Sequence, residues 1–328
     1  LAALDALRGL KMQPSVNLRF FFEGEEEAGS PHVADYLKLP EMSHPDAWVF
    51  CDGPVHQSRR MELVFGARGS VDLDLTVYGP IKGLHDGHYG NWVPNPIVRL
   101  THLIDSMRDE SGRILIKGFY DDLRKPTAIE KEALAKIPNV TEGNGKSLNE
   151  LLMLPSLNLR GIEAGHVGSQ ASNTIPTEAR ASIDFRLVPN ETPESIKPLV
   201  EKHIVAQGFS IVRQTPDAAA RLASAKIVKV EWGPGYPASR TPLDLPFSRE
   251  LAAIMAAAGH EPILLPTAGG SLPMNLFQQG NNAPVIVFPI ANHDDNQHAA
   301  NENLRLQNLW DGIEVFASFF TSLDHANN

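Results

Sequence analysis

The sequence predicts an α/β domain that is interrupted by an inserted α+β domain. Segments typical of helices and strands alternate up to about residue 68, which is the pattern of an α/β domain. From Val71 to Val77, apolar and polar residues alternate instead, as in an antiparallel strand with one solvated face. The first pattern returns near residue 240. We therefore expect residues 1–68 and 240–328 to form one domain, and residues 69–239 to form the inserted one.

The first part of the α/β domain begins with leucines at helical spacing. Leu1, Leu4, Leu7 and Leu10 predict a helix over residues 1–10. An apolar run predicts a strand over residues 16–22. The Ser30-Pro31 pair is typical of a helix start and predicts a helix over residues 31–38. A short buried strand over residues 47–51 follows and ends at Asp52-Gly53.

The inserted domain has a half-exposed sheet and helices that cover it. The predicted strands are residues 71–77, 181–187 and 227–232. The predicted helices are residues 96–107 and about 193–205. Residues 117–154 are charged and irregular, and we expect helices and loops there. The last part of the chain predicts a helix over residues 248–258 closed by Gly259, a strand over 285–288 and a helix over 306–323.

Composition limits the class of protein. The chain has 328 residues, of which 42% are hydrophobic and 21% charged, as in globular enzymes. Its net charge of -10 argues against nucleic acid and anionic membranes as partners. No apolar run reaches the roughly 18 residues of a membrane helix. Cys51 is the only cysteine, so no intrachain disulfide can form, which suits a reducing compartment. We expect a cytoplasmic protein.

The acidic run at residues 23–27, Glu-Gly-Glu-Glu-Glu, follows the first predicted strand. Neighbouring carboxylates at the end of a buried strand are costly unless a positive charge lies near them. Divalent cations prefer such oxygen ligands, so the run suggests a metal site. The alternative is a solvated acidic loop.

Four other polar features have a structural as well as a functional interpretation. Asp52 could be a metal ligand or only part of an Asp-Gly turn. His85 lies in a glycine-rich loop, and Arg186 lies within a predicted strand. His298 lies in a loop rich in aspartate and asparagine.

The positions of these residues favour the functional interpretation. Glu26, Glu27, Asp52 and His298 each follow a predicted strand of the α/β domain. Ligands of open α/β sheets bind beyond the carboxyl ends of the strands. We therefore expect the four residues to form one cluster, and carboxylates with an imidazole suit zinc or manganese.

Ordered motifs along nearly the whole chain resemble a family of metallopeptidases. This superfamily contains carnosinase-like dipeptidases, aminoacylases, glutamate carboxypeptidase and succinyl-diaminopimelate desuccinylase, and the sequence is most similar to the carnosinase-like branch. The motifs are EGEEE at 23–27, CD at 51–52, LHDG at 84–87, PSL at 155–157, GIE at 161–163, TIP at 174–176, RLVPN at 186–190, GGSLP at 269–273 and HAANE at 298–302.

The resemblance implies a two-metal amide hydrolase with an inserted lid and dimerisation domain. It implies that Glu26 is the general base, and that His85 reaches the partner subunit's site and stabilises the oxyanion. Glu27 and His298 would bind one metal ion and Asp52 the other. The metals would be zinc, with manganese or cobalt as alternatives. Residues implied in substrate binding are Arg186, Asn173, Gly270 and Ser271.

One part of the family pattern is missing from the sequence. The family also uses an upstream His-x-Asp histidine and a metal-bridging aspartate, and neither occurs here. We therefore expect that the catalytic domain is truncated at its N-terminus, and that this chain alone binds metal poorly and is nearly inactive. For the intact protein, the resemblance implies a homodimer that cleaves dipeptides or N-acyl amino acids with a free carboxylate. The alternatives are an N-acyl amino acid deacylase and a non-catalytic dimeric binding protein.

Overall fold

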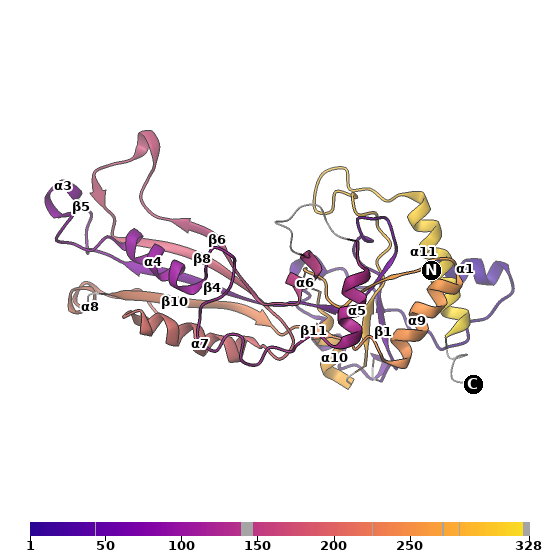
Figure 1. Cartoon of the computed structure of the whole chain (residues 1–328). Helices are drawn as coiled ribbons and strands as arrows, with labels where there is room; N and C mark the ends of the chain where they lie inside the picture. Colours follow the sequence, from indigo (N-terminus) through magenta and orange to yellow (C-terminus); the bar gives the residue numbers. More distant parts are fainter. Residues whose placement is uncertain (43, 139–146, 225, 271, 282, 324–328) are drawn as a thin grey trace. The chain divides into compact units, whose positions relative to one another are not determined.

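The structure is a computed structural model that describes residues 1–328 except 43, 139–146, 225, 271, 282 and 324–328 (Figure 1). The chain divides into two units. Unit 1 comprises Leu1–Arg68, Lys125–Met153 and Ser239–Asn328, and unit 2 comprises Gly69–Arg124 and Leu154–Ala238. The described part of the chain contains no helix that is long and apolar enough to cross a bilayer.

Unit 2 is built on a five-stranded sheet with the order β6-β8-β4-β10-β9. All its strand pairs are antiparallel except the parallel pair of β9 and β10. The strands are β4 (Gly69–Tyr78), β6 (Ser156–Glu163), β8 (Glu178–Leu187), β9 (Ser210–Val212) and β10 (Ile227–Tyr236). This arrangement confirms the α+β class expected from the alternation in residues 71–77.

Two helices lie along one face of this sheet, α4 (Pro96–Met107) and α7 (Pro193–Ala206) (Figure 1). The Asn95 side chain caps the start of α4, and a Thr192–Ser195 capping box starts α7. Apolar side chains from both helices pack with alternate residues of the central strands to form the core of unit 2. Members of this core include Leu100, Leu103, Ile196, Val200, Val71, Leu73, Leu75, Val77, Ile183 and Phe185.

The other face of the sheet is polar. The residues between the core positions of β4 and β8 make ion pairs and hydrogen bonds across the strands. Arg160 pairs with Asp72 at 3.0 Å, and the Ser182 hydroxyl donates to Asp74 at 2.6 Å. The alternation of apolar and polar residues along these strands therefore separates the packed face of the sheet from its hydrated face.

A small substructure lies beyond the end of the sheet at which β8 starts (Figure 1). It consists of the two-residue strands β5 (Leu84–His85) and β7 (Thr174–Ile175), which pair antiparallel, and the short helix α3 (Asp86–Tyr89). The remaining elements of unit 2 are η3 (Gly168–Gln170) and α8 (Ala218–Ala223).

Unit 1 has a mixed four-stranded sheet with the order β1-β13-β2-β12. The pairs β1–β13 and β2–β12 are parallel, and β13 and β2 are antiparallel. The bounds are β1 (Trp48–Phe50), β2 (Glu62–Val64), β12 (Ile263–Leu265) and β13 (Val285–Val287). A second sheet pairs β3 (Gly66–Ala67) with β11 (Ser239–Arg240).

Helices cover both faces of the main sheet of unit 1. Ile286 packs with α1 (Ala2–Gly9), α9 (Pro246–Ala257) and α11 (Leu306–Ser322), whereas its neighbours Val285 and Val287 pack with α10 (Met274–Asn281). Coverage of both faces is the α/β arrangement expected for this part of the chain. The short elements η1 (Glu26–Ala28), α2 (Val33–Tyr36) and η2 (Pro40–Met42) precede β1.

Two local predictions in the first part of unit 1 are wrong. Residues 16–22 form no strand, because their backbone does not pair with a neighbouring strand. Their apolar side chains still pack, and the Phe21 ring lies edge-on to that of Phe277 with 5.9 Å between the ring centroids. The helix predicted over residues 31–38 is shorter, Val33–Tyr36. Its N-cap is His32 rather than Ser30, which has a left-handed φ of 52°.

The described residues of the segment 125–153 differ from the expected division of the chain, since they belong to unit 1 rather than unit 2. They contain α5 (Ala128–Lys136) and α6 (Leu148–Leu152). Leu134 packs with Ile263 of β12, and Glu130 forms a buried ion pair with Arg240 at 2.9 Å. The sequence predicted helices and loops of the inserted domain here, but apolar positions of α5 pack against β12 at an edge of the unit 1 sheet.

Glu62 of β2 gives a prediction for the stability of unit 1. Burial raises the pKa of Glu62 to about 7 from its ordinary 4.5. The folded state therefore prefers the protonated carboxyl, and stability should fall as the pH rises from 4.5 to about 7. The loss is at most about 3 kcal/mol, since one pKa unit corresponds to about 1.4 kcal/mol.

The variant Glu62→Gln should remove this pH dependence because its side chain does not ionise. Urea unfolding should show that the variant gains up to about 3 kcal/mol over the wild type at pH 8 and little at pH 4.5. An equal difference at both pH values would show that ionisation of Glu62 is not the cause.

Candidate active site

The carboxyl ends of β1 and β13 lie side by side at one edge of the unit 1 sheet. The two strands are parallel, and the segments that follow them stay joined by backbone hydrogen bonds. The N–H of Val55 donates to the carbonyl of Ala291 at 2.8 Å, and the N–H of Ala291 donates to the carbonyl of Gly53 at 3.3 Å. Asp52 follows β1 and the loop containing His298 follows β13, so both start from the edge at which open sheets bind ligands.

The acidic run folds into the single turn η1, which Gly29 closes with a left-handed φ of 83°. The N–H of Gly29 donates to the carbonyl of Glu26 at 2.8 Å. Glu25 leaves the run to pair with His32, whose Nδ1 lies 2.7 Å from Glu25 Oε2. The local fold therefore gives the neighbouring glutamates different surroundings.

Glu26 and Glu27 meet the residues from the other two segments. His298 Nε2 lies 3.0 Å from Glu27 Oε1. Partial burial raises the pKa of Glu26, and the charges of Asp52, Glu27 and Glu23 raise it further, while His298 opposes them. The structure thus brings Glu26, Glu27, Asp52 and His298 together.

The cluster fits a divalent cation by its chemistry. Glu23 Oε1 is buried and accepts no hydrogen bond from the described residues. The carboxylates of Asp52, Glu27 and Glu23 raise the pKa of Glu26 because negative charges repel one another. A bound cation would neutralise this excess of negative charge. Among the described residues, however, no three histidine, cysteine, aspartate or glutamate side chains are already arranged as a ligand set.

Glu23 belongs to the same cluster, although the sequence assigned it no role of its own. Its charge acts on Glu26, although three positions separate them. The only sequence signal was its place at the start of the acidic run, and the sequence did not show that its oxygen would be buried.

His85 caps helix α3 in unit 2. Its Nδ1 accepts a hydrogen bond from the N–H of Gly87 at 3.1 Å, and the same N–H also donates to Asp86 Oδ1 at 2.7 Å. With Nδ1 as the acceptor, the neutral ring carries its proton on Nε2. The side chain is 56% exposed, which leaves that N–H available to a ligand. Gly87 permits the arrangement, because a Cβ there would lie 3.1 Å from Cε1 of the ring.

Of the residues predicted to bind substrate, Asn173 lies beside His85 and Arg186 does not. The carbonyl of Asn173 accepts from the N–H of Asp86 at 3.1 Å. Arg186 lies at the opposite end of the sheet, where it pairs with Ser70, and its Nε donates to Asp184 at 2.8 Å.

The substrate loop predicted at residues 270 and 271 belongs to unit 1. Gly270 is exposed, and nothing lies within 4 Å of a Cβ built on it. It follows β12 and the bridge between Ala268 and Ala67. Ser271 lies outside the described residues.

Comparison with known proteins shows a similarity to metallopeptidases. Residues 65–210 match the family model of the peptidase dimerisation domain, M20_dimer. The structure resembles the M20 family metallo-carboxypeptidase Sso-CP2 from Sulfolobus solfataricus with a TM-score of 0.80 and 26% identity, over 98% of this chain and 73% of that one. Residues 65–210 are therefore similar to the M20 dimerisation domain, and nearly the whole chain is similar in fold to an M20 metallopeptidase.

Within this class, curated relatives are dipeptidases. The Cys-Gly metallodipeptidase dug1 of Schizosaccharomyces pombe is 26% identical over 98% of this chain and 69% of its own length. The Beta-Ala-His dipeptidase of Rattus norvegicus is 27% identical over 98% of this chain and 67% of its own length. These matches confirm the superfamily and the carnosinase-like branch that the motifs predicted, and they support a peptidase.

Proposed function

We propose that the protein is a metal-dependent dipeptidase that hydrolyses the amide bond of small peptides with a free carboxylate. The observation that carries the proposal is the meeting of Glu26, Glu27, Asp52 and His298 at one sheet edge, which includes the 3.0 Å contact between His298 and Glu27. The dipeptidase relatives support the choice of substrate.

Glu27, Asp52 and His298 would hold divalent metal, with zinc as the first choice and two ions in the complete site. When bound, the metal would polarise the scissile carbonyl and lower the pKa of water toward neutrality. Carboxylate and imidazole groups are the donors that such ions take in proteins.

Glu26 would act as the general base. Its environment raises the pKa of its carboxylate, which makes it a better proton acceptor. It would take a proton from the attacking water and return it to the leaving amine. Glu26 and Glu27 would thus have different roles because their surroundings differ.

Substrate recognition would use residues outside the metal cluster. Arg186 would bind the substrate carboxylate, because a guanidinium can hold a carboxylate with two parallel hydrogen bonds. Gly270 and Ser271 would contact the rest of the substrate, and Asn173, which lies beside His85, would contact the substrate held by the partner subunit.

The His85 Nε2–H would stabilise the oxyanion, and it would do so in the partner subunit. Where β8 pairs with β4, Arg186 lies opposite Ser70 and Glu178 lies opposite Tyr78. Strand β5 lies beyond the Tyr78 end of β4 (Figure 1). Eight residues of strand span about 25 Å, whereas an extended dipeptide spans at most about 7 Å. His85 and Arg186 of one chain are therefore too far apart to act on the same dipeptide, which supports a role for His85 in the site of the partner subunit.

The experiment compares four substrate types with the full-length protein loaded with zinc: a dipeptide such as β-Ala-His or Cys-Gly, its C-terminal amide, an N-acetyl amino acid and a longer peptide. We expect hydrolysis of the dipeptide and a loss of about 10- to 100-fold in kcat/KM for the amide, because the charged hydrogen bonds of the carboxylate are lost. Faster cleavage of the N-acetyl amino acid would identify a deacylase instead. Binding without cleavage of any of them would identify a non-catalytic relative.

A further inference from the structure

The loop that carries His298 contains an unusual concentration of left-handed backbone. Asn296, His298 and Asn301 have φ values of 63°, 61° and 62°. Asparagine adopts this conformation fairly readily, but histidine adopts it less often. Each such residue costs on the order of 1 kcal/mol or more and persists only where its surroundings enforce it. The loop must therefore be held by contacts other than its own backbone preference.

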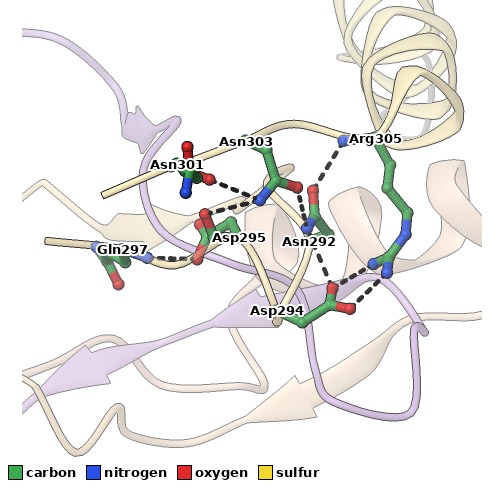
Figure 2. A network of polar contacts seen from close by, with 7 residues as sticks. All are labelled: Asn292, Asp294, Asp295, Gln297, Asn301, Asn303 and Arg305. Carbon is green, nitrogen blue, oxygen red and sulfur yellow. Dashed lines mark hydrogen bonds and ion pairs between the residues drawn. The ribbon is translucent and has the colours of Figure 1, made fainter. Parts of the chain in front are cut away.

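Asn292 provides the central contact of this loop (Figure 2). It is 1% exposed. Its Nδ2 donates to Asp294 Oδ1 at 3.1 Å and to Asn303 Oδ1 at 3.3 Å, and its Oδ1 accepts from the N–H of Arg305 at 2.8 Å. One buried amide therefore joins the start of the loop to its end, on both sides of His298.

Two further connections close the loop. Arg305 directly precedes α11, and both of its terminal nitrogens bind the two carboxylate oxygens of Asp294. Asp295 is buried; its carboxylate accepts from the N–H of Gln297 at 3.0 Å, and its carbonyl accepts from the N–H of Asn303 at 2.8 Å. Figure 2 shows that these contacts form one continuous network.

We propose that Asn292 and the Asp294–Arg305 pair are positioning residues that hold His298 in its left-handed conformation against Glu27. None of them is a candidate ligand, so they would act only through His298. This inference rests on the proposed function, in which His298 binds metal. Groups that orient metal ligands typically change metal affinity or activity 10- to 100-fold when they are replaced.

The test uses three variants that keep the size of the side chain. Asn292→Asp replaces the Nδ2 donors by an oxygen that faces the oxygens of Asp294 and Asn303. Asp294→Asn removes the charge from the pair, and Arg305→Lys keeps the charge but loses the two-pronged geometry. In the full-length protein, Zn²⁺ affinity is measured by competition with a chromophoric chelator, together with kcat and KM at limiting and excess Zn²⁺.

We expect Asn292→Asp to weaken Zn²⁺ binding about 10- to 100-fold, with smaller losses for the two others. The loss of kcat at limiting Zn²⁺ should be recovered at excess Zn²⁺, and KM should change little. The control is Asp5→Asn, which breaks the exposed Asp5–Arg8 pair of α1 in the same unit and should leave Zn²⁺ affinity unchanged.

A double-mutant cycle with His298→Ala separates positioning from a general structural role. If Asn292 acts through His298, Asn292→Asp should weaken Zn²⁺ binding much less when His298 is already absent. Equal losses in both backgrounds would overturn the positioning role, as would unchanged affinity of Asn292→Asp and Asp294→Asn. If His298→Ala itself leaves Zn²⁺ affinity unchanged, the proposed metal site is wrong, which is a different result.

Discussion

In the full-length protein, Glu26→Gln should lower kcat by about 10²- to 10⁴-fold, which is the range that a general base contributes. Glutamine has the same size as glutamate but cannot accept the proton of the attacking water. Because Glu26 is not among the proposed ligands, the bound metal should stay unchanged when measured by atomic emission. Substrate affinity should change little, so the loss should appear in kcat rather than in KM.

Glu25→Gln is the matched control, since it makes the same substitution one residue earlier. Glu25 pairs with His32 at the surface and, in our proposal, takes no part in the chemistry. We expect its kcat to stay within a few-fold of the wild type, because exposed ion pairs contribute about 0–1 kcal/mol. If the two variants lost similar activity, the acidic run would act by its total charge and Glu26 would not be the base.

The part of the site that lies at the sheet edge could be predicted because it follows from chain order. Asp52 and His298 each come after a short buried apolar run, and two parallel strands must end at the same edge. The structure makes those runs the neighbouring strands β1 and β13. The alternation from Val71 to Val77 likewise predicted which residues of β4 face the core, because side chains of a strand alternate between faces.

What the sequence could not show depends on contacts between distant segments. Residues 16–22 have the composition of a strand, but whether a strand forms depends on a partner with free backbone groups, and composition does not reveal a partner. The charged texture of residues 125–153 hid the apolar face of α5, which packs against β12. The network around Asn292 consists of asparagines and aspartates, which a sequence pattern identifies only as a polar loop.

The position of His85 also depended on the structure. The glycine-rich loop suggested a turn, but only the hydrogen bond from Gly87 to Nδ1 shows which nitrogen carries the proton. Only the strand register shows that Arg186 lies at the other end of the sheet. These two observations give the second large prediction.

His85→Ala should lower kcat by about 10²- to 10³-fold, which is the usual effect of losing one donor to an oxyanion. The bound metal should not change, because His85 lies in unit 2 and the proposed ligands lie in unit 1. Gly87→Ala should also lower kcat, since its Cβ would lie 3.1 Å from the imidazole and displace it. Its loss should be smaller than that of His85→Ala, because the donor is moved rather than removed.

Mixing His85→Ala with Glu26→Gln tests whether His85 acts on the partner's site. In a mixed dimer, the subunit with intact Glu26 would receive His85 from the Glu26→Gln subunit, so one of its two sites would be complete. Random exchange of equal amounts makes half of the dimers mixed, and about a quarter of the wild-type activity should return. If His85 served its own subunit, every chain would carry one defect and no activity would return. Complete subunit exchange without rescue would therefore exclude action in the partner, as would a fully active monomer.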